Sequence, residues 1–337
     1  FFTPRALIQA SDEVVAAYKA ARFPAGQTAA DLCCGIGGDL LALAERGSCT
    51  GVDRDEVLVH LAQRNCEVIG RGGGRGLVAD AATFPVQEYA AWHIDPDRRP
   101  SGKRTTQVER YEPPLEVLEA LLLKNPHAAI KLAPAADSRL SLRESASFRG
   151  AKGDYIFDIA QLEWLESRGE CRQQVAWFGS LALRPGEKSA TIVDAAGGPR
   201  TVRGRGEEPV PVAEKIGRFL YEPAAAVLAA KLTQILCTEH RLQAVSRQAM
   251  YLTGGELIQD AALTGFKVQE VLPLDQRQLK AWLRQRGIGR LEIKKRGCDV
   301  EPEKLRKILG GQGDESATLL ICPIAGKVQA IVARRVG

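Results

Sequence analysis

A glycine turn that follows an apolar segment is the part of this sequence best suited to chemistry. The stretch Thr28–Arg46 reads TAADLCCGIGGDLLALAER, in which an apolar run leads into Gly35, Gly37 and Gly38 and then into a periodic apolar segment. This order predicts a strand, a tight turn and a helix, which is the first unit of a nucleotide-binding sheet. Glycines suit such a turn because the backbone bends sharply there and no side chain blocks an approaching ligand.

Two acidic residues flank this turn. Asp31 lies in the apolar run before it, and Asp53 ends the next apolar segment, Cys49–Asp53. A carboxylate about 20 residues after the first strand can accept hydrogen bonds from the ribose of a bound nucleotide. We therefore expect Asp53 to bind a ribose, and Asp31 to order the turn or to reach a cationic group of the same ligand.

The glycine spacing distinguishes between kinds of ligand. A dinucleotide site needs the pattern G-x-G-x-x-G, but Leu40 stands where the third glycine would be. The series Asp31-x-Cys33-x-Gly35-x-Gly37 is instead similar to the first motif of class I S-adenosylmethionine-dependent methyltransferases. This resemblance favours S-adenosylmethionine over a dinucleotide, and a glycine turn without a ligand is the remaining interpretation.

More candidate residues follow the expected strands. Asp80 suits the adenine amino group, with the backbone N–H of Ala81 available for a ring nitrogen, although Asp80 could also be a helix N-cap. Arg54 follows Asp53 and could bind the ligand or help to cap the next helix. The expected cofactor-binding set is Asp31, Cys33, Gly35, Gly37, Gly38, Asp53, Arg54, Asp80 and Ala81.

The loop Asp95-Pro96-Asp97-Arg98-Arg99 follows the fourth expected strand, where methyltransferases of this fold hold the methyl acceptor. Methyl transfer is an in-line displacement, and positioning can lower such a barrier by about 7–11 kcal/mol. We expect Asp95 and Pro96 to be catalytic, with Asp95 accepting a hydrogen bond from an amine. Arg98 and Arg99 would hold a phosphate or carboxylate of the substrate. A solvent-exposed basic turn is the alternative.

Apolar segments alternate with amphipathic ones along residues 1–200. Strands are expected at 28–33, 48–53, 77–79, 92–95, 128–132, within 153–165, at 175–178 and at 190–193, and helices at 4–22, 38–46, 56–69 and 114–124. The glycine-rich stretch 70–76 is expected to be a loop. This alternation predicts an α/β domain with a doubly wound, mostly parallel sheet, whose ligands lie beyond the carboxyl ends of the strands.

The rest of the chain divides into two further parts. Residues 201–255 are expected to be a linker and helical connector, with helices at 223–236 and 242–250. Residues 256–337 are expected to form a small α+β domain. Its strands are expected at 267–272, 290–294, 317–322 and 327–334, and its helices at 275–286 and 302–309.

The net charge of +5 is unevenly distributed. Residues 265–337 hold 15 Lys+Arg and 8 Asp+Glu, a net charge of +7, so the rest of the chain carries −2. This distribution is typical of a catalytic domain with a polyanion-binding appendage, and a solvated basic face is the alternative. Within it, Lys294, Lys295 and Arg296 are candidate RNA-binding residues. Side chains alternate along a strand, so Lys294 and Arg296 are expected on one face and Lys295 on the other.

Cysteine spacing argues against a metal centre. None of the eight cysteines forms a C-x-x-C pair. We therefore expect no metal, and free thiols of this kind favour the cytoplasm. The sequence has no apolar run of about 18 residues, so we expect no membrane span.

Motifs along nearly the whole chain resemble a bacterial family of class I methyltransferases with a C-terminal THUMP-like domain. They are Phe2-Thr3-Pro4, Asp31-Leu-Cys-Cys-Gly-Ile-Gly-Gly-Asp39, Asp95-Pro-Asp-Arg-Arg99, Tyr221-Glu-Pro223, Arg290-Leu-Glu-Ile-Lys-Lys-Arg-Gly297 and Gly313-Asp-Glu-Ser-Ala-Thr318. The amino-terminal half is more distantly similar to trimethylguanosine synthases, RNA cap methyltransferases, but it lacks their Pro-Pro-Trp after the fourth strand.

The resemblance implies a Rossmann-like methyltransferase domain, S-adenosylmethionine as cofactor and RNA as partner. The favoured function is methylation of an RNA base or exocyclic amine, with the C-terminal domain assisting RNA binding. The alternative is a cofactor-binding protein with a small-molecule or protein methyl acceptor, or one without catalytic activity.

Overall fold

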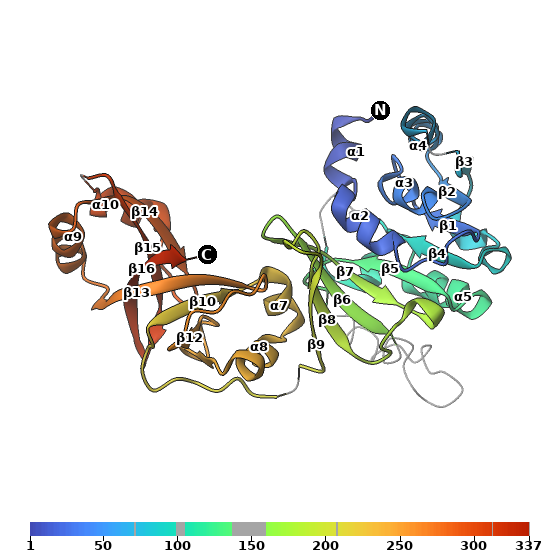
Figure 1. Cartoon of the computed structure of the whole chain (residues 1–337). Helices are drawn as coiled ribbons and strands as arrows, with labels where there is room; N and C mark the ends of the chain where they lie inside the picture. Colours follow the sequence, from blue (N-terminus) through green and yellow to red (C-terminus); the bar gives the residue numbers. More distant parts are fainter. Residues whose placement is uncertain (71, 99–104, 137–159, 207, 312, 337) are drawn as a thin grey trace. The chain divides into compact units, whose positions relative to one another are not determined.

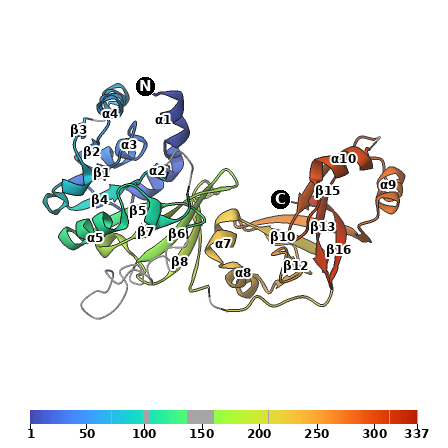
Figure 2. The same cartoon turned by 180° about the vertical axis from the view of Figure 1, so that it is seen from behind.

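The computed structural model describes residues 1–70, 72–98, 105–136, 160–206, 208–311 and 313–336. The chain divides into two compact units, Phe1–Arg205 and Gly206–Gly337. Each unit is built around a sheet of its own (Figures 1 and 2).

The described residues of the first unit form a nine-stranded sheet in the order β3-β2-β1-β4-β5-β7-β6-β8-β9. The strands are β1 (Ala29–Leu32), β2 (Cys49–Asp53), β3 (Gly74–Val78), β4 (Ala91–Ile94), β5 (Ala128–Leu132), β6 (Gln161–Ser167), β7 (Glu170–Trp177), β8 (Lys188–Ile192) and β9 (Arg200–Gly204). Strands β1 to β5 pair in parallel, and β7 runs antiparallel between β5 and β6. The predicted doubly wound, mostly parallel sheet is therefore confirmed.

Helices cover both faces of this sheet. They are α1 (Pro4–Gln9), α2 (Glu13–Ala20), α3 (Gly38–Ala44), α4 (Glu56–Ile69) and α5 (Leu115–Lys124). Figures 1 and 2 show α2, α3 and α4 on one side of the strands and α5 on the other. Every residue of β1, β4 and β5 is buried, as expected for strands covered on both faces.

The expectation of one helix over residues 4–22 is wrong, because the chain breaks between α1 and α2. Ala10 adopts an extended conformation, and the Asp12 carboxylate accepts the backbone N–H groups of Val14 and Val15. Asp12 thus begins a new helix as its N-cap. The break leaves Ser11 outside both helices, and its hydroxyl donates a hydrogen bond to Asp39 of α3.

Two further expectations for this unit differ from the structure. The end of the expected loop 70–76 belongs to β3, where Gly74 to Gly76 pair with Cys49 to Gly51 of β2. A Cβ at Gly76 would lie 2.8 Å from the side chain of Val59, so glycine lets α4 pack closely against this strand. Strand β9 was not expected, and part of the stretch 153–165 lies outside the described residues.

The second unit holds a seven-stranded sheet in the order β11-β12-β10-β13-β16-β15-β14 within its described residues. The strands are β10 (Phe219–Pro223), β11 (Gln243–Ala244), β12 (Leu252–Gly254), β13 (Leu263–Pro273), β14 (Ile288–Lys295), β15 (Glu315–Ile324) and β16 (Lys327–Val336). Its helices are α7 (Ala225–Ala230), α8 (Thr233–His240), α9 (Gln276–Gln285) and α10 (Pro302–Leu309). Leucines of α9 and α10 pack on the β14–β15–β16 part of the sheet.

The segment 201–255 contains strands as well as helices. Its β10 pairs with both β12 and β13, so it lies inside the second sheet. The expected helix at 242–250 is wrong, because Gln243 and Ala244 pair with Thr253 and Leu252 instead. This pairing across a turn outweighs the helical pattern of the segment. No helix in the described part of the chain is both long and apolar enough to cross a membrane.

Candidate active site

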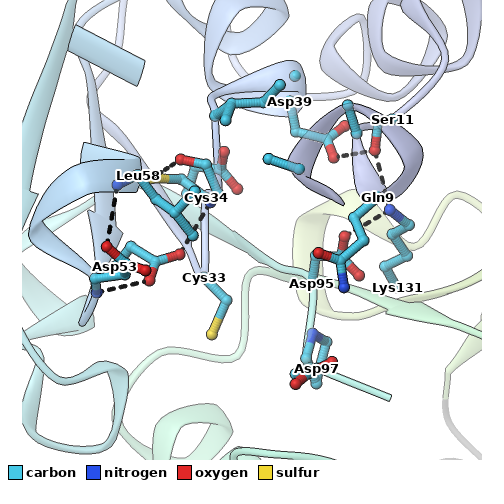
Figure 3. Close-up of a pocket in the computed structure, with 18 of the residues that line it drawn as sticks. Gln9, Ser11, Cys33, Cys34, Asp39, Asp53, Leu58, Asp95, Asp97 and Lys131 are labelled. Carbon is cyan, nitrogen blue, oxygen red and sulfur yellow. Dashed lines mark hydrogen bonds and ion pairs between the residues drawn. The ribbon is translucent and has the colours of Figure 1, made fainter. Parts of the chain in front are cut away.

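A cavity of about 940 Å³ opens at the carboxyl edge of the first sheet (Figure 3). The glycine turn, the end of β2, the end of β4 and the junction between α1 and α2 all line it. The sequence placed the expected cofactor-binding and catalytic residues at strand ends, and all of them except Gly37 line this one cavity. Ligand pockets typically measure roughly 300–1,000 Å³, so the cavity has room for a nucleotide-sized group and part of a second one.

The glycine turn presents open backbone to this cavity. Gly35 has a φ of +55°, and no atom lies within 4 Å of the position that a Cβ would take there. Gly37 has a φ of +89° and is the N-cap of α3, and its missing Cβ points toward Ala62 of α4 instead. Cys33 also has a positive φ of 55°, although it is not a glycine. Burial raises the pKa of the Cys33 thiol, so it is a poor nucleophile.

Asp53 joins the end of β2 to the glycine turn. Its Oδ2 accepts the backbone N–H of Gly35 at 3.0 Å, and its Oδ1 accepts the backbone N–H of Asp55 at 3.0 Å. A carboxylate offers about four acceptor positions, so ribose hydroxyls can still bind it. Asp55 itself caps α4, and Arg54 pairs with Glu112 at 3.3 Å at the exposed rim.

Asp80 and Ala81 line the cavity beside Asp53. The Oδ1 atom of Asp80 accepts the backbone N–H of Ala82 at 2.9 Å and so caps the short 3₁₀ helix Ala81–Thr83. The N-cap alternative for Asp80 is therefore present in the structure. It does not exclude a ligand contact, because Asp80 is exposed.

Buried charged side chains lie directly beneath the glycine turn. The Oδ1 atom of Asp31 lies 2.7 Å from Nδ1 of His93, and Nε2 of His93 lies 3.1 Å from Nζ of Lys19. Lys19 in turn forms a 2.6 Å ion pair with Asp39. A protonated Lys19 only donates hydrogen bonds, so His93 accepts at Nε2 and donates from Nδ1 to Asp31. The other oxygen of Asp31, Oδ2, is buried and has no hydrogen-bond partner in the described residues.

Burial and pairing change the pKa values of these groups in opposite directions. Burial raises the pKa of Asp31, and the hydrogen bond from His93 only partly opposes this. Burial also lowers the pKa of Lys19, which the charge of Asp39 counteracts. For Asp39 burial acts in the raising direction, but the charges led by Lys19 hold its pKa well below the usual range. Asp39 is therefore a firmly ionised group beneath the cavity.

The same polar chain continues to the expected acceptor site (Figure 3). Ser11 donates a 2.6 Å hydrogen bond to Asp39, and Lys131 donates to Ser11 at 3.1 Å. Lys131 also forms a 2.6 Å ion pair with Oδ2 of Asp95. Lys131 is 5% exposed on β5, whereas the Asp95 side chain is 27% exposed. Lys131 thus holds Asp95 at the cavity wall, and Ser11 connects both residues to α3.

The loop after Asp95 is held by backbone pairing. Pro96 is buried, and Asp97 exchanges two backbone hydrogen bonds with Glu112. Arg98 lines the cavity, and its buried Nη1 has no hydrogen-bond partner in the described residues. Arg99 lies outside the part of the chain that the structure describes.

The sequence reasoning missed five residues of this site. Three of them, His93, Lys131 and Lys19, are basic residues in segments that read as buried strand or helix. A buried basic residue needs an acidic or polar partner. A basic residue within an apolar segment was therefore the sequence feature that could have indicated these three. Ser11 and Asp39 had no such signal, because they meet only through the break between α1 and α2.

In the second unit, two of the three expected RNA-binding cations form ion pairs with a glutamate. Lys294 and Arg296 both pair with Glu222 of β10, at 2.6 Å and 3.0 Å. Lys295, between them in sequence, is exposed. Glu222 belongs to the Tyr221-Glu-Pro223 motif, so two motifs noted in the sequence meet here.

Known proteins match both units. The THUMP domain-like family profile matches residues 263–335. Two strains of Mycobacterium tuberculosis each have a relative named an uncharacterized S-adenosylmethionine-dependent methyltransferase. Each is 30% identical over 334 residues, which covers 98% of this chain and 87% of the relative. A crystal structure from Porphyromonas gingivalis, described as a methyltransferase, has a TM-score of 0.79 at 18% identity, and the match covers 99% of this chain and 83% of that chain.

The near full-length relatives establish the family, and the solved structure shows the same fold. The chain belongs to a family of S-adenosylmethionine-dependent methyltransferases that carry a C-terminal THUMP-like domain.

Proposed function

We propose that this protein transfers a methyl group from S-adenosylmethionine to a base or exocyclic amine of RNA. The observation that most supports this is the single cavity lined by both Asp53 and Asp95. The first residue suits a ribose, and the second suits an amine. A cofactor and an acceptor bound there would meet at the carboxyl edge of one sheet.

The residues on the β1–β2 side fit the parts of S-adenosylmethionine. Asp53 would accept the ribose hydroxyls, and Asp80 the adenine amino group. The unpartnered Oδ2 of Asp31 is the acceptor left for the methionine ammonium. Gly35 would let the ligand approach its backbone, since nothing occupies the space beside its Cα. When bound, the cofactor supplies a sulfonium with an electrophilic methyl group.

Asp95 and Pro96 would position the acceptor. The Asp95 carboxylate would accept an N–H of the acceptor amine and orient the nitrogen lone pair. The ion pair with Lys131 fixes the carboxylate, and the buried Pro96 stiffens the floor beside it. Positioning of this kind can supply a large part of the rate enhancement of a displacement reaction.

The proposal of RNA as acceptor is supported by the second unit. A THUMP domain-like match covers residues 263–335, the region with the surplus of basic residues. Of the three neighbouring cations Lys294, Lys295 and Arg296, Lys295 is the exposed one. Lys294 and Arg296 both form ion pairs with Glu222. All eight cysteines are free thiols, which supports a cytoplasmic site of action.

The test is methylation of total RNA isolated from a strain that lacks this gene. Purified protein and S-adenosylmethionine with a labelled methyl group should label a discrete RNA species. Asp95→Ala should remove the label while the affinity for S-adenosylhomocysteine, measured by calorimetry, stays the same. Label that appears only in the small-molecule or protein fraction of an extract would support the alternative acceptors and contradict RNA.

A further inference from the structure

The charges along the carboxyl edge of the first sheet change sign at β4. On the β1–β2 side the cavity is lined by Asp31, Asp53 and Asp80, and by Arg54, which pairs with Glu112. Beyond β4 it is lined by Lys131 of β5, then by Arg172 of β7, and by Arg168, which directly follows β6. The acidic side suits a cofactor with hydroxyl, ammonium and sulfonium groups. The basic side suits an anion.

The strand register brings the basic side chains to the same edge as Asp95. Leu132 at the end of β5 pairs with Gln174 of β7, so Gln173 and Arg172 lie just beyond the end of β5. Strand β6 runs parallel to β5, because both are antiparallel to β7. The turn from β6 to β7, which contains Arg168, therefore lies at this edge as well.

Several donors on the basic side have no acceptor in the described residues. Gln173 is 2% exposed and its Nε2 is unpartnered, and so is the buried Nη1 of Arg98. Arg172 pairs with Glu170 through Nη1 at 2.7 Å, and its buried Nε has no partner. A buried donor without a partner destabilises the protein. Arg98, Arg172 and Gln173 all line the one cavity, so the residues that carry these donors lie where a ligand rich in acceptor oxygens could bind.

Arg168 lies in the tight turn between β6 and β7. Ser167 and Glu170 pair, and the two residues between them, Arg168 and Gly169, have φ values of 54° and 75°. Two-residue hairpin turns with both φ values positive favour Asn-Gly or Gly-Gly. Ala325 and Gly326 adopt the same turn between β15 and β16, so the conformation itself does not single out Arg168. What the turn does is place the exposed Arg168 where it lines the cavity.

We propose that Arg98, Arg168, Arg172 and Gln173 form a subsite for a phosphate group of the methyl acceptor. Guanidinium groups bind phosphate through paired N–H donors, and the amide of Gln173 adds another donor. The phosphate would lie on the β7 side of Asp95, while the group to be methylated contacts Asp95. The inference rests on the proposed use of this cavity for methyl transfer, but it does not require the phosphate to belong to RNA.

The experiment compares Arg168→Gln/Arg172→Gln with Arg64→Gln/Arg184→Gln, which removes the same charge from the same unit away from the cavity. Binding of total tRNA, AMP and adenosine is measured with S-adenosylhomocysteine present. The first variant should lose about tenfold or more in affinity for the phosphate-bearing probes. Its binding of adenosine and of S-adenosylhomocysteine should stay like that of the wild type, and the second variant should behave like the wild type throughout.

Each outcome bears on the subsite. Equal losses in both double variants, or no loss in the first, would overturn it. A loss with tRNA but not with AMP would assign the subsite to a polynucleotide, and the same loss with both would assign it to any nucleotide phosphate. Loss of S-adenosylhomocysteine binding in the first variant would show that these arginines support the cofactor site, and it would overturn the proposal. Failure to methylate RNA would contradict the proposed function while leaving the phosphate result standing.

Discussion

Asp53→Ala separates ligand binding from loop stability in this cavity. In the protein the carboxylate accepts two backbone N–H groups, those of Gly35 and Asp55, at 3.0 Å each. Two ribose hydroxyls would donate to the same group. Loss of hydrogen bonds to a charged acceptor costs about 1.5–3 kcal/mol, so affinity for S-adenosylhomocysteine should fall by about 10- to 150-fold. The free energy of unfolding should fall as well, because the glycine turn loses its anchor.

Asp55→Ala is the matched control for this experiment. Asp55 also accepts two backbone N–H groups, from Val57 and Leu58, but it uses them to cap α4. Loss of an N-cap costs about 0.5–2 kcal/mol of stability. Calorimetric titration with S-adenosylhomocysteine and urea unfolding, both at one pH, measure the two effects for each variant. We expect a similar loss of stability in both variants and a large loss of affinity in Asp53→Ala alone. Equal affinity losses would refute a ribose contact and leave Asp53 with a purely structural role.

Lys131→Met should lower methyl transfer by about 10- to 150-fold, because Asp95 loses its ion pair, while S-adenosylhomocysteine affinity changes less than about twofold. Labelled methyl transfer measures this, and wild-type turnover would contradict a positioning role. Asp39→Asn should destabilise the protein by roughly 3–5 kcal/mol at neutral pH, since it leaves Lys19 buried without its partner. The pKa of Asp39 is lowered by folding, so its contribution is present above its unfolded pKa of about 3.9 and is lost as pH falls below that value. Urea unfolding between pH 2 and pH 7 should therefore show the wild type and Asp39→Asn converging in acid, and a constant difference would argue against the ion pair. Lys295→Glu should reduce the slope of log affinity against log salt concentration for tRNA by an amount equal to about one phosphate contact. An unchanged slope in filter binding would show that Lys295 does not contact RNA.

Local patterns were enough to predict which residues line the β1–β2 side of the cavity. The turn at Gly35 to Gly38 and the acids Asp31 and Asp53 lie within a few residues of the strand ends that carry them. Parallel strands bring their carboxyl ends to one edge, so the pattern also predicted that these residues would meet. The alternation of strands and helices also predicted the sheet itself, because the spacing of apolar residues indicates which side of each element is buried.

The β4–β7 side of the cavity was decided by the tertiary structure. Lys131 pairs with Asp95 because β5 lies next to β4, and Arg172 and Gln173 enter the cavity because β7 reverses direction beside β5. A sequence pattern describes one element at a time and does not state which strands become neighbours. The same limit explains the second unit, where Glu222 meets Lys294 from 72 residues away. Propensity and periodicity act over a few residues, whereas the partner of a buried or half-buried charge depends on strand order, which emerges only when the whole chain packs.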